Sequence, residues 1–469
     1  MKYHHSLSEG SVARSVFELA LPLLLVSILQ SLNGSVNSIW VGHYLGESAL
    51  AATSNANTVV IALVGAALGI TMAAAILVGQ CIGAGNIGDA KRIVGTSATF
   101  FASISIGASI VGLTLSEPLL AFMKTPEESL PLAVPYMRVI ILALPSMLMY
   151  DFVMSVLNGA GDSKTPFYFM LLSVAIDIAL NPLFIFGFGP IPRLGIAGSA
   201  LATVMAQTVS LTAIVIHLYR SQHPLCLRKN EFSMLRVRWA IIGALIRKGI
   251  PMGGNVLVFC LSEMLMITLV NRFGVDTTAA YGASIQLWNL IPMLAAAIAT
   301  AASTMAAHSF GAQKWGRVHS ITRVGVVYSI LGTGCIVLTI EFLDKHAFEL
   351  FMPVGAPALH IASHINRLAT WSWVFSSVSM VLLGVTRATG AVMAPLLITT
   401  LSILVVRISL ASALLDKWNA DAIWWSFSIS SALDMGLSGL YYKYGGWRRA
   451  QVDISVHREA LGTHRTQDL

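Results

Sequence analysis

Residues 16–40 read VFELALPLLLVSILQSLNGSVNSIW, and Glu18 is the only charged residue in this run. A helix needs about 20 mostly apolar residues to cross the hydrocarbon core of a bilayer, so this run predicts a spanning helix. Eleven more runs of the same kind follow it along the chain. Together they predict an all-α polytopic membrane protein with twelve transmembrane helices, at residues 16–40, 55–80, 94–116, 132–157, 167–188, 195–219, 244–270, 279–307, 321–341, 367–385, 394–415 and 421–442.

The composition points to the same class of protein. Hydrophobic residues make up 56% of the 469 residues and charged residues only 11%, whereas soluble domains carry about 25% charged residues. Of the 29 Lys and Arg residues, 21 lie on the side that contains the N-terminus, 7 on the other side and 1 within a span. By the positive-inside rule we expect both termini in the cytoplasm and the protein in the plasma (inner) membrane. The net charge of +7 follows from this topology and does not indicate a nucleic-acid partner.

An internal repeat organises the chain. Three features of the first half return in the second half after 228 or 229 residues: Leu21-Pro22 as Ile250-Pro251, Gly46 as Gly274, and Gly161 as Gly390. A constant offset predicts two homologous six-helix bundles, an arrangement of parallel repeats that occurs in secondary transporters. We expect an N-terminal lobe at 1–219, a cytoplasmic connector at 220–243, a C-terminal lobe at 244–446 and a cytoplasmic tail at 447–469. The connector alternates basic and apolar residues. This pattern predicts either a segment that lies partly in the lipid headgroup layer or a solvated linker.

The fifth predicted span carries an acid within the membrane. Asp177 and Asn181 are four residues apart and therefore share one face of a helix, and Pro182 frees the carbonyl of Ile178 from its usual hydrogen bond. Ionisable groups inside a membrane are costly and usually face a protein interior or a water-filled cavity. The group could bind a proton or Na⁺ during transport, or it could be a packing cluster held by hydrogen bonds. We predict that Asp177 is the principal ion-coupling acid, with Asn181 beside it.

Other polar residues in the spans are candidates for coupling or for a substrate cavity. Glu263 in the seventh span is either a second coupling acid or a structural ion-pair partner, and Arg407 in the eleventh span needs an acceptor such as Glu263 or Asp434. Neutral groups could line a cavity or join helices. For the cavity we predict Asn33, Asn255, Gln286, Trp288 and Asn289, and for ion coupling Asn37 as well.

Several chemical motifs are missing from the sequence. The chain has no Gly-x-x-x-x-Gly-Lys-Ser/Thr phosphate loop, no nucleophile with a nearby histidine base, and no paired cysteine or histidine spacing typical of a zinc site. We therefore expect a protein that is not an enzyme and uses an ion gradient, H⁺ or Na⁺, without another cofactor.

The motifs resemble those of the MATE (multidrug and toxic compound extrusion) transporters. The matching residues are Leu19-Ala-Leu-Pro22, Val41-Gly42, Leu45-Gly46, Ala49-Leu-Ala-Ala52, Gly79-Gln80, Gly83-Ala-Gly85, Leu157-Asn-Gly159-Ala-Gly161-Asp162, Lys164-Thr-Pro166, Asn181-Pro-Leu-Phe-Ile-Phe-Gly187, Gly311-Ala312 and Arg407-Ile408. The resemblance covers all twelve spans. It implies an efflux antiporter with two six-helix lobes, a central cavity and alternating access, acting as a monomer on a small-molecule substrate in the lipid bilayer. It also implies that the first span bends at Pro22.

Three positions depart from the family pattern. A family aspartate in span one falls at Asn37, which cannot titrate. Many relatives place Asn one turn before Asp in span five, whereas here Asp177 precedes Asn181 on the same face. Glu263 lies one turn beyond the family's span-seven glutamate, which aligns near Phe259. A flippase for lipid-linked precursors, with a similar fold, is the alternative function.

Overall fold

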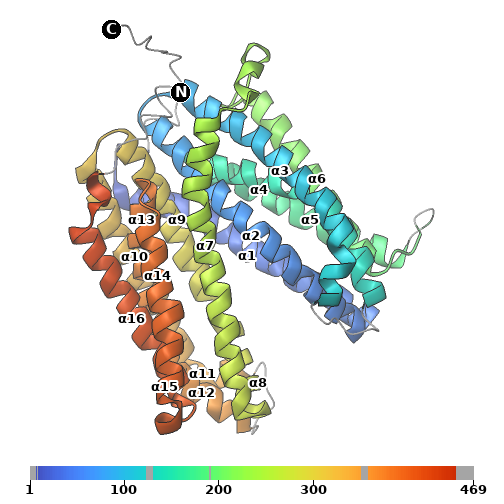
Figure 1. Ribbon diagram of the computed structural model, residues 1–469, viewed down its shortest axis with the longest axis vertical. Helices are drawn as coiled ribbons and strands as arrows, with labels where there is room; N and C mark the ends of the chain where they lie inside the picture. The colour runs from blue at the N-terminus through green and yellow to red at the C-terminus, as the bar shows by residue number, and fades with distance from the viewer. Residues whose placement is uncertain are drawn as a thin grey trace. The chain divides into compact units, whose positions relative to one another are not determined.

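The computed structural model describes residues 7, 9–122, 130–187, 189, 192–349 and 357–449, and within these ranges the chain forms helices and no strands (Figure 1). The elements in chain order are α1 (Val12–Leu45), α2 (Glu47–Gly83), α3 (Ile87–Phe122), α4 (Leu130–Gly159), α5 (Lys164–Phe186), α6 (Ile196–Arg220), the 3-10 helix η1 (Lys229–Leu235), α7 (Trp239–Val270), η2 (Asn271–Phe273), α8 (Val275–Trp288), α9 (Leu290–Gly311), α10 (Trp315–Phe342), α11 (Asp344–Glu349), α12 (Pro357–Ala369), α13 (Ser372–Ala388), α14 (Met393–Thr399), the π-helical turn η3 (Thr400–Val406), α15 (Arg407–Trp418), α16 (Asp421–Tyr444) and η4 (Gly446–Arg449).

Each predicted span corresponds to a helix or to a broken helix. Among the described residues, nine helical stretches are long and apolar enough to cross a membrane, and the bent pair α12–α13 makes a tenth. The two remaining spans are α2, whose apolar run covers residues 59–83, and α16, which contains five serines and is therefore less apolar. The all-α polytopic fold is confirmed.

Three spans are interrupted, which the sequence did not predict. The eighth span has a one-residue interruption at Asn289, between α8 and α9, where the backbone keeps helical dihedral angles (φ −53°, ψ −27°). The tenth bends by 41° between α12 and α13. The eleventh contains a π-helical turn immediately before Arg407, and such turns occur frequently at functional sites.

The chain divides into two compact units. The Leu25–Ile250 unit holds most of the first half, and the Pro251–Val452 unit also includes residues up to Leu24. The division falls within α1, two residues after Pro22, and within α7, immediately before Pro251.

In the Leu25–Ile250 unit, α4 packs against α2, α3 and α6, and α6 packs against α5 (Figure 1). The contact between α5 and α6 is very close at Gly198, where a Cβ atom would lie 2.4 Å from the backbone oxygen of Phe184. The end of α5 is closed by the backbone N–H of Leu194, which donates to the same oxygen at 3.1 Å. Glycine at position 198 therefore allows α6 to lie directly against α5.

The Pro251–Val452 unit has its own apolar core. α13 packs against α9, α10 and α16, and α15 packs against α16. Large side chains such as Tyr281, Trp288 and Trp424 lie in the core, and each of these three is at most 3% exposed.

The connector between the repeats is packed on α3. Lys91 donates to both carboxylate oxygens of Glu231, at 2.8 and 2.7 Å, and Thr99 donates to the backbone oxygen of Leu235 at 2.8 Å. The backbone N–H of Arg228 also donates to Glu231 at 2.9 Å. Because of this N–H bond and the adjacent lysine, the pKa of Glu231 lies below its usual value. The connector is thus held by specific contacts, while Phe232 is 55% exposed.

Candidate functional site

Asp177 lies at the centre of a polar cluster in the Leu25–Ile250 unit. Its carboxylate accepts a hydrogen bond from Asn37 of α1 at 2.9 Å, from Thr203 of α6 at 3.1 Å and from Asn181 of α5 at 3.2 Å. Asn33 of α1 also interacts with the carboxylate. Three helices therefore contribute donors to one acid.

The local structure explains why these side chains meet. Asn181 follows Asp177 by one turn, and its amide bridges the cluster by donating to the Asn37 side-chain oxygen at 2.6 Å and to the Asp177 backbone oxygen at 3.1 Å. The close approach of α6 to α5 at Gly198 brings Thr203, little more than one turn further along α6, within reach of the acid. The predicted pairing of Asp177 with Asn181 on one face is present, and α1 adds Asn33 and Asn37 to it.

The cluster is buried and rich in acceptor atoms. Asp177 is 1% exposed and Asn181 is fully buried. The side-chain oxygens of Asn181 and Asn33 are buried without a hydrogen-bond partner. All the donors on the carboxylate are neutral, and Asp177 takes part in none of the ion pairs found among the described residues. A buried carboxylate without a cationic partner is chemically suited to binding a proton or a monovalent cation.

Arg407 and Glu263 form an ion pair in the Pro251–Val452 unit. The Nη1 atom of Arg407 lies 3.6 Å from Oε1 of Glu263, and the Tyr281 hydroxyl donates to Glu263 at 3.1 Å. The guanidinium also lies over the ring of Phe427, 4.6 Å from its centroid. Arg407 is 4% exposed, whereas the side chain of Glu263 is 45% exposed. Of the two acceptors expected for Arg407, Glu263 is the direct partner.

The other predicted site residues of this unit differ in burial and do not form one cluster. Gln286 and Asn289 are exposed and contact each other at 3.3 Å next to the break between α8 and α9. Trp288 is in the core and donates its indole N–H to Asn366 at 3.0 Å. Asn255 is 7% exposed, donates to the backbone oxygen of Pro251 at 3.4 Å, and has a buried side-chain oxygen without a partner.

Some residues at these sites were missed by the sequence reasoning. Thr203 and Tyr281 each donate to a predicted acid, and Ser430 and Ser431 contact Arg407. Hydroxyl residues are common in transmembrane helices, so their presence alone gave no signal. The serine spacing in α16 could have indicated a polar face next to Arg407.

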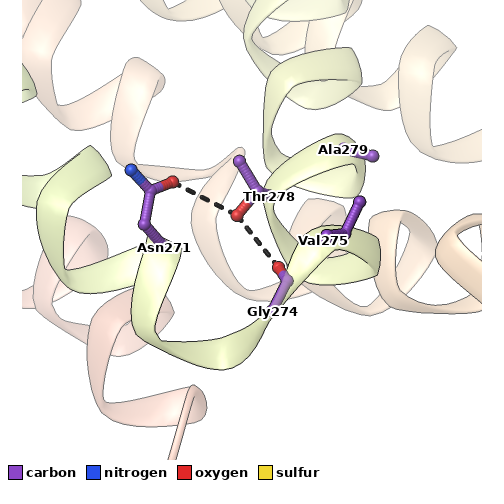
Figure 2. A pocket seen from close by; sticks show the side chains of 5 residues that line it. All are labelled: Asn271, Gly274, Val275, Thr278 and Ala279. Carbon is purple, nitrogen blue, oxygen red and sulfur yellow. Dashed lines mark hydrogen bonds between the residues drawn. The ribbon is translucent and has the colours of Figure 1, made fainter.

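A surface cavity of about 410 Å³ lies elsewhere, at the junction of η2 and α8. Figure 2 shows its lining residues, Asn271, Gly274, Val275, Thr278 and Ala279. The Thr278 hydroxyl lies 3.2 Å from the Asn271 side-chain oxygen and 3.0 Å from the Gly274 backbone oxygen. The predicted site residues do not line this cavity, and it holds no ionisable side chain.

Comparison with known proteins identifies the family. The MatE family model matches residues 22–183 and 251–412, so the two matched segments are related by the offset of 229 residues that the internal repeat predicts. Several curated relatives are named as probable multidrug resistance proteins. YoeA of Bacillus subtilis is 32% identical over 447 residues, which cover 95% of this chain and 96% of YoeA. NorM of Thermotoga maritima is 23% identical over 455 residues, which cover 96% of each chain.

Solved structures agree with the fold. A crystal structure of MATE in the bent conformation superposes with a TM-score of 0.87 at 18% identity, covering 98% of this chain and 99% of that chain. The straight conformation gives a TM-score of 0.85 at 18% identity, with coverage of 97% and 98%. The two repeats, the spanning helices and these matches together show that the chain belongs to the MATE family of multidrug efflux transporters.

Proposed function

We propose that this protein exports small organic molecules, often cationic and amphipathic, in exchange for H⁺, by alternating access between its two repeats. The names of the relatives support drugs as substrates, since YoeA and NorM are both described as probable multidrug resistance proteins. The observation that carries the coupling mechanism is the buried Asp177 carboxylate, which has neutral donors from three helices.

Burial explains how this acid could couple ion movement to conformational change. Deprotonation of Asp177 creates a negative charge that neutral donors stabilise, namely the amides of Asn33, Asn37 and Asn181 and the hydroxyl of Thr203. Since these donors belong to α1, α5 and α6, the two protonation states favour different packing of the three helices. The proton drives export only if it and the substrate favour different conformations.

We propose H⁺ as the coupling ion because the carboxylate oxygens already accept several hydrogen bonds. A proton binds directly to one of these oxygens, and the resulting hydroxyl needs only one acceptor. A cation such as Na⁺ must gather several oxygen ligands. The unmatched oxygens of Asn33 and Asn181 are the natural additional ligands if Na⁺ is the coupling ion instead.

The remaining assignments complete this proposal. The protein is a monomer in the plasma membrane. Both of its termini lie in the cytoplasm. Asn33 of the Leu25–Ile250 unit is proposed to bind substrate, and so are Gln286, Asn289 and Asn255 of the Pro251–Val452 unit. Trp288 contributes to the same region by fixing α8 against Asn366. Pro22 is the position at which α1 bends, and it lies two residues from the boundary between the compact units.

Dye transport in everted membrane vesicles tests the proposal. Vesicles that contain the protein should accumulate a cationic dye when a proton gradient is present, and a protonophore should abolish the accumulation. Accumulation driven by a Na⁺ gradient alone would replace H⁺ with Na⁺. If neither gradient drives dye transport but lipid-linked precursors are translocated, the flippase function would replace the efflux function.

A further inference from the structure

A row of buried hydroxyl groups lies between α13 and α16 in the Pro251–Val452 unit. Ser376 and Ser379 come from α13, and Ser430, Ser431 and Ser438 come from α16; all five are at most 7% exposed. We call this group the serine seam. It includes one acid, Asp434, which is 3% exposed, and it ends at Arg407.

The hydrogen bonds of the seam form two short chains. Arg407 donates to Ser430 at 3.0 Å and contacts Ser431 at 3.5 Å, and Ser376 donates to Ser431 at 3.0 Å. In the second chain, Ser379 contacts Oδ2 of Asp434, and its hydroxyl oxygen lies 2.8 Å from that of Ser438.

The other oxygen of Asp434 has no partner. Oδ1 is buried and lacks a hydrogen bond. An unmatched oxygen is much more costly on an ionised carboxylate than on a neutral acid. This environment therefore favours an Asp434 that carries a proton on Oδ2 and leaves Oδ1 as a neutral carbonyl oxygen.

The second chain can accept this proton without moving a heavy atom. When Asp434 is ionised, Ser438 donates to Ser379, and Ser379 donates to Oδ2. When a proton binds to Oδ2, Asp434 donates to Ser379, and Ser379 donates to Ser438. The Ser379 hydrogen then rotates from Oδ2 to Ser438, the Ser438 hydrogen turns away from Ser379, and release of the proton reverses both rotations.

The charged groups around Asp434 leave it without a direct ion pair. Arg407 of α15 is paired with Glu263 of α7, which also accepts from Tyr281 of α8. Arg387 of α13 donates to the Leu383 backbone oxygen. Both Arg407 and Arg387 influence Asp434 only through space. α14 and η3 carry no ionisable side chain. The pair His364–Asp421, between α12 and α16, lies thirteen residues before Asp434.

We propose that the Pro251–Val452 unit has a proton-binding site of its own, in which Asp434 binds one proton and the serine seam orients it. The site differs from the Asp177 cluster in its helices and in its donors, which are hydroxyls instead of amides. Na⁺ fits it poorly, because the hydroxyls are already bonded to one another and to Arg407. A role for this proton in exchange rests on the proposed antiport, whereas proton binding itself does not.

Infrared spectroscopy of the purified full-length protein in lipid nanodiscs tests the site. The Asp434→Asn substitution should remove one component of the carbonyl stretch of protonated carboxyl groups at the pH values where the protein is folded. The matched control, Asp421→Asn on the same helix, should leave that component unchanged. The component should also persist in Asp177→Asn, which separates the two acids.

A second variant guards against a folding defect. Ser379→Ala keeps the acid but removes its hydroxyl partner, so the carboxyl component should shift in frequency. An unchanged carboxyl band in both Asp434→Asn and Ser379→Ala would overturn the proposal. Since the spectra do not depend on transport, a loss of the component in a protein that exports no dye would refute the proposed antiport but leave the proton site intact.

Discussion

The contact between α5 and α6 makes a quantitative prediction for the substitution Gly198→Ala. The new Cβ atom would lie 2.4 Å from the backbone oxygen of Phe184, whereas carbon atoms in good contact lie about 3.5–4.0 Å from their neighbours. The helices must therefore separate by about 1 Å. Thr203 Oγ1, now 3.1 Å from Asp177, would then lie beyond the range of an ordinary hydrogen bond.

Two losses should follow from this separation. Overpacking of this kind costs about 1–3 kcal/mol of folding free energy, so the thermal unfolding midpoint of the protein in detergent should fall. Gradient-driven dye efflux should fall as well, because Asp177 loses one of its donors. The matched control is Gly107→Ala on α3, where a Cβ atom meets nothing within 4 Å and alanine is favoured over glycine by about 0.5–1 kcal/mol in a helix. If Gly198→Ala had the same thermal unfolding midpoint and the same dye efflux as the control, the packing argument would be refuted.

Three further predictions concern single contacts. Thr203→Val should slow coupled efflux about tenfold while substrate binding is kept, since a hydrogen bond to a charged group contributes about 1.5–3 kcal/mol, and Thr203→Ser should restore transport. Glu231→Gln should lower thermal stability at neutral pH; because Arg228 and Lys91 hold the pKa of Glu231 below its usual value, the difference from the parent should vanish as the pH falls through that lowered pKa. Arg317 donates to three backbone oxygens ahead of α1 at 3.0 Å each, so Arg317→Ala should speed amide exchange at the start of α1, and equal exchange rates would contradict this.

The sequence was informative where a local pattern determines the structure. Apolar runs identify spans because every spanning helix needs the same length of hydrocarbon-soluble surface, and the repeat follows from equal spacing. Hydropathy does not report the direction of a helix, so the 41° bend before α13 could not be predicted. The interruption at Asn289 lies three residues before Pro292, which cannot donate a backbone hydrogen bond to Trp288, so the sequence did contain a signal for it.

The candidate site was predictable only in part for a similar reason. Asp177 and Asn181 share a face by virtue of their spacing, which is a property of one helix. Their contact with Asn37 and Thr203 depends on which helices are neighbours, and the close approach at Gly198 is a property of two helices. The pairing of Arg407 with Glu263 also joins segments about 140 residues apart, so the sequence could offer candidates for the partner but could not choose between Glu263 and Asp434.

Transport by Asp177→Asn in proteoliposomes is the most direct measurement of the coupling mechanism. The variant replaces the carboxylate group with an amide group of the same size. The amide cannot gain or lose a proton at that position. It should bind substrate and allow downhill movement, but it should not accumulate dye against its concentration gradient when a proton gradient is imposed. Uphill transport at the parental rate by a correctly folded Asp177→Asn protein would contradict the assignment of Asp177 as the coupling acid.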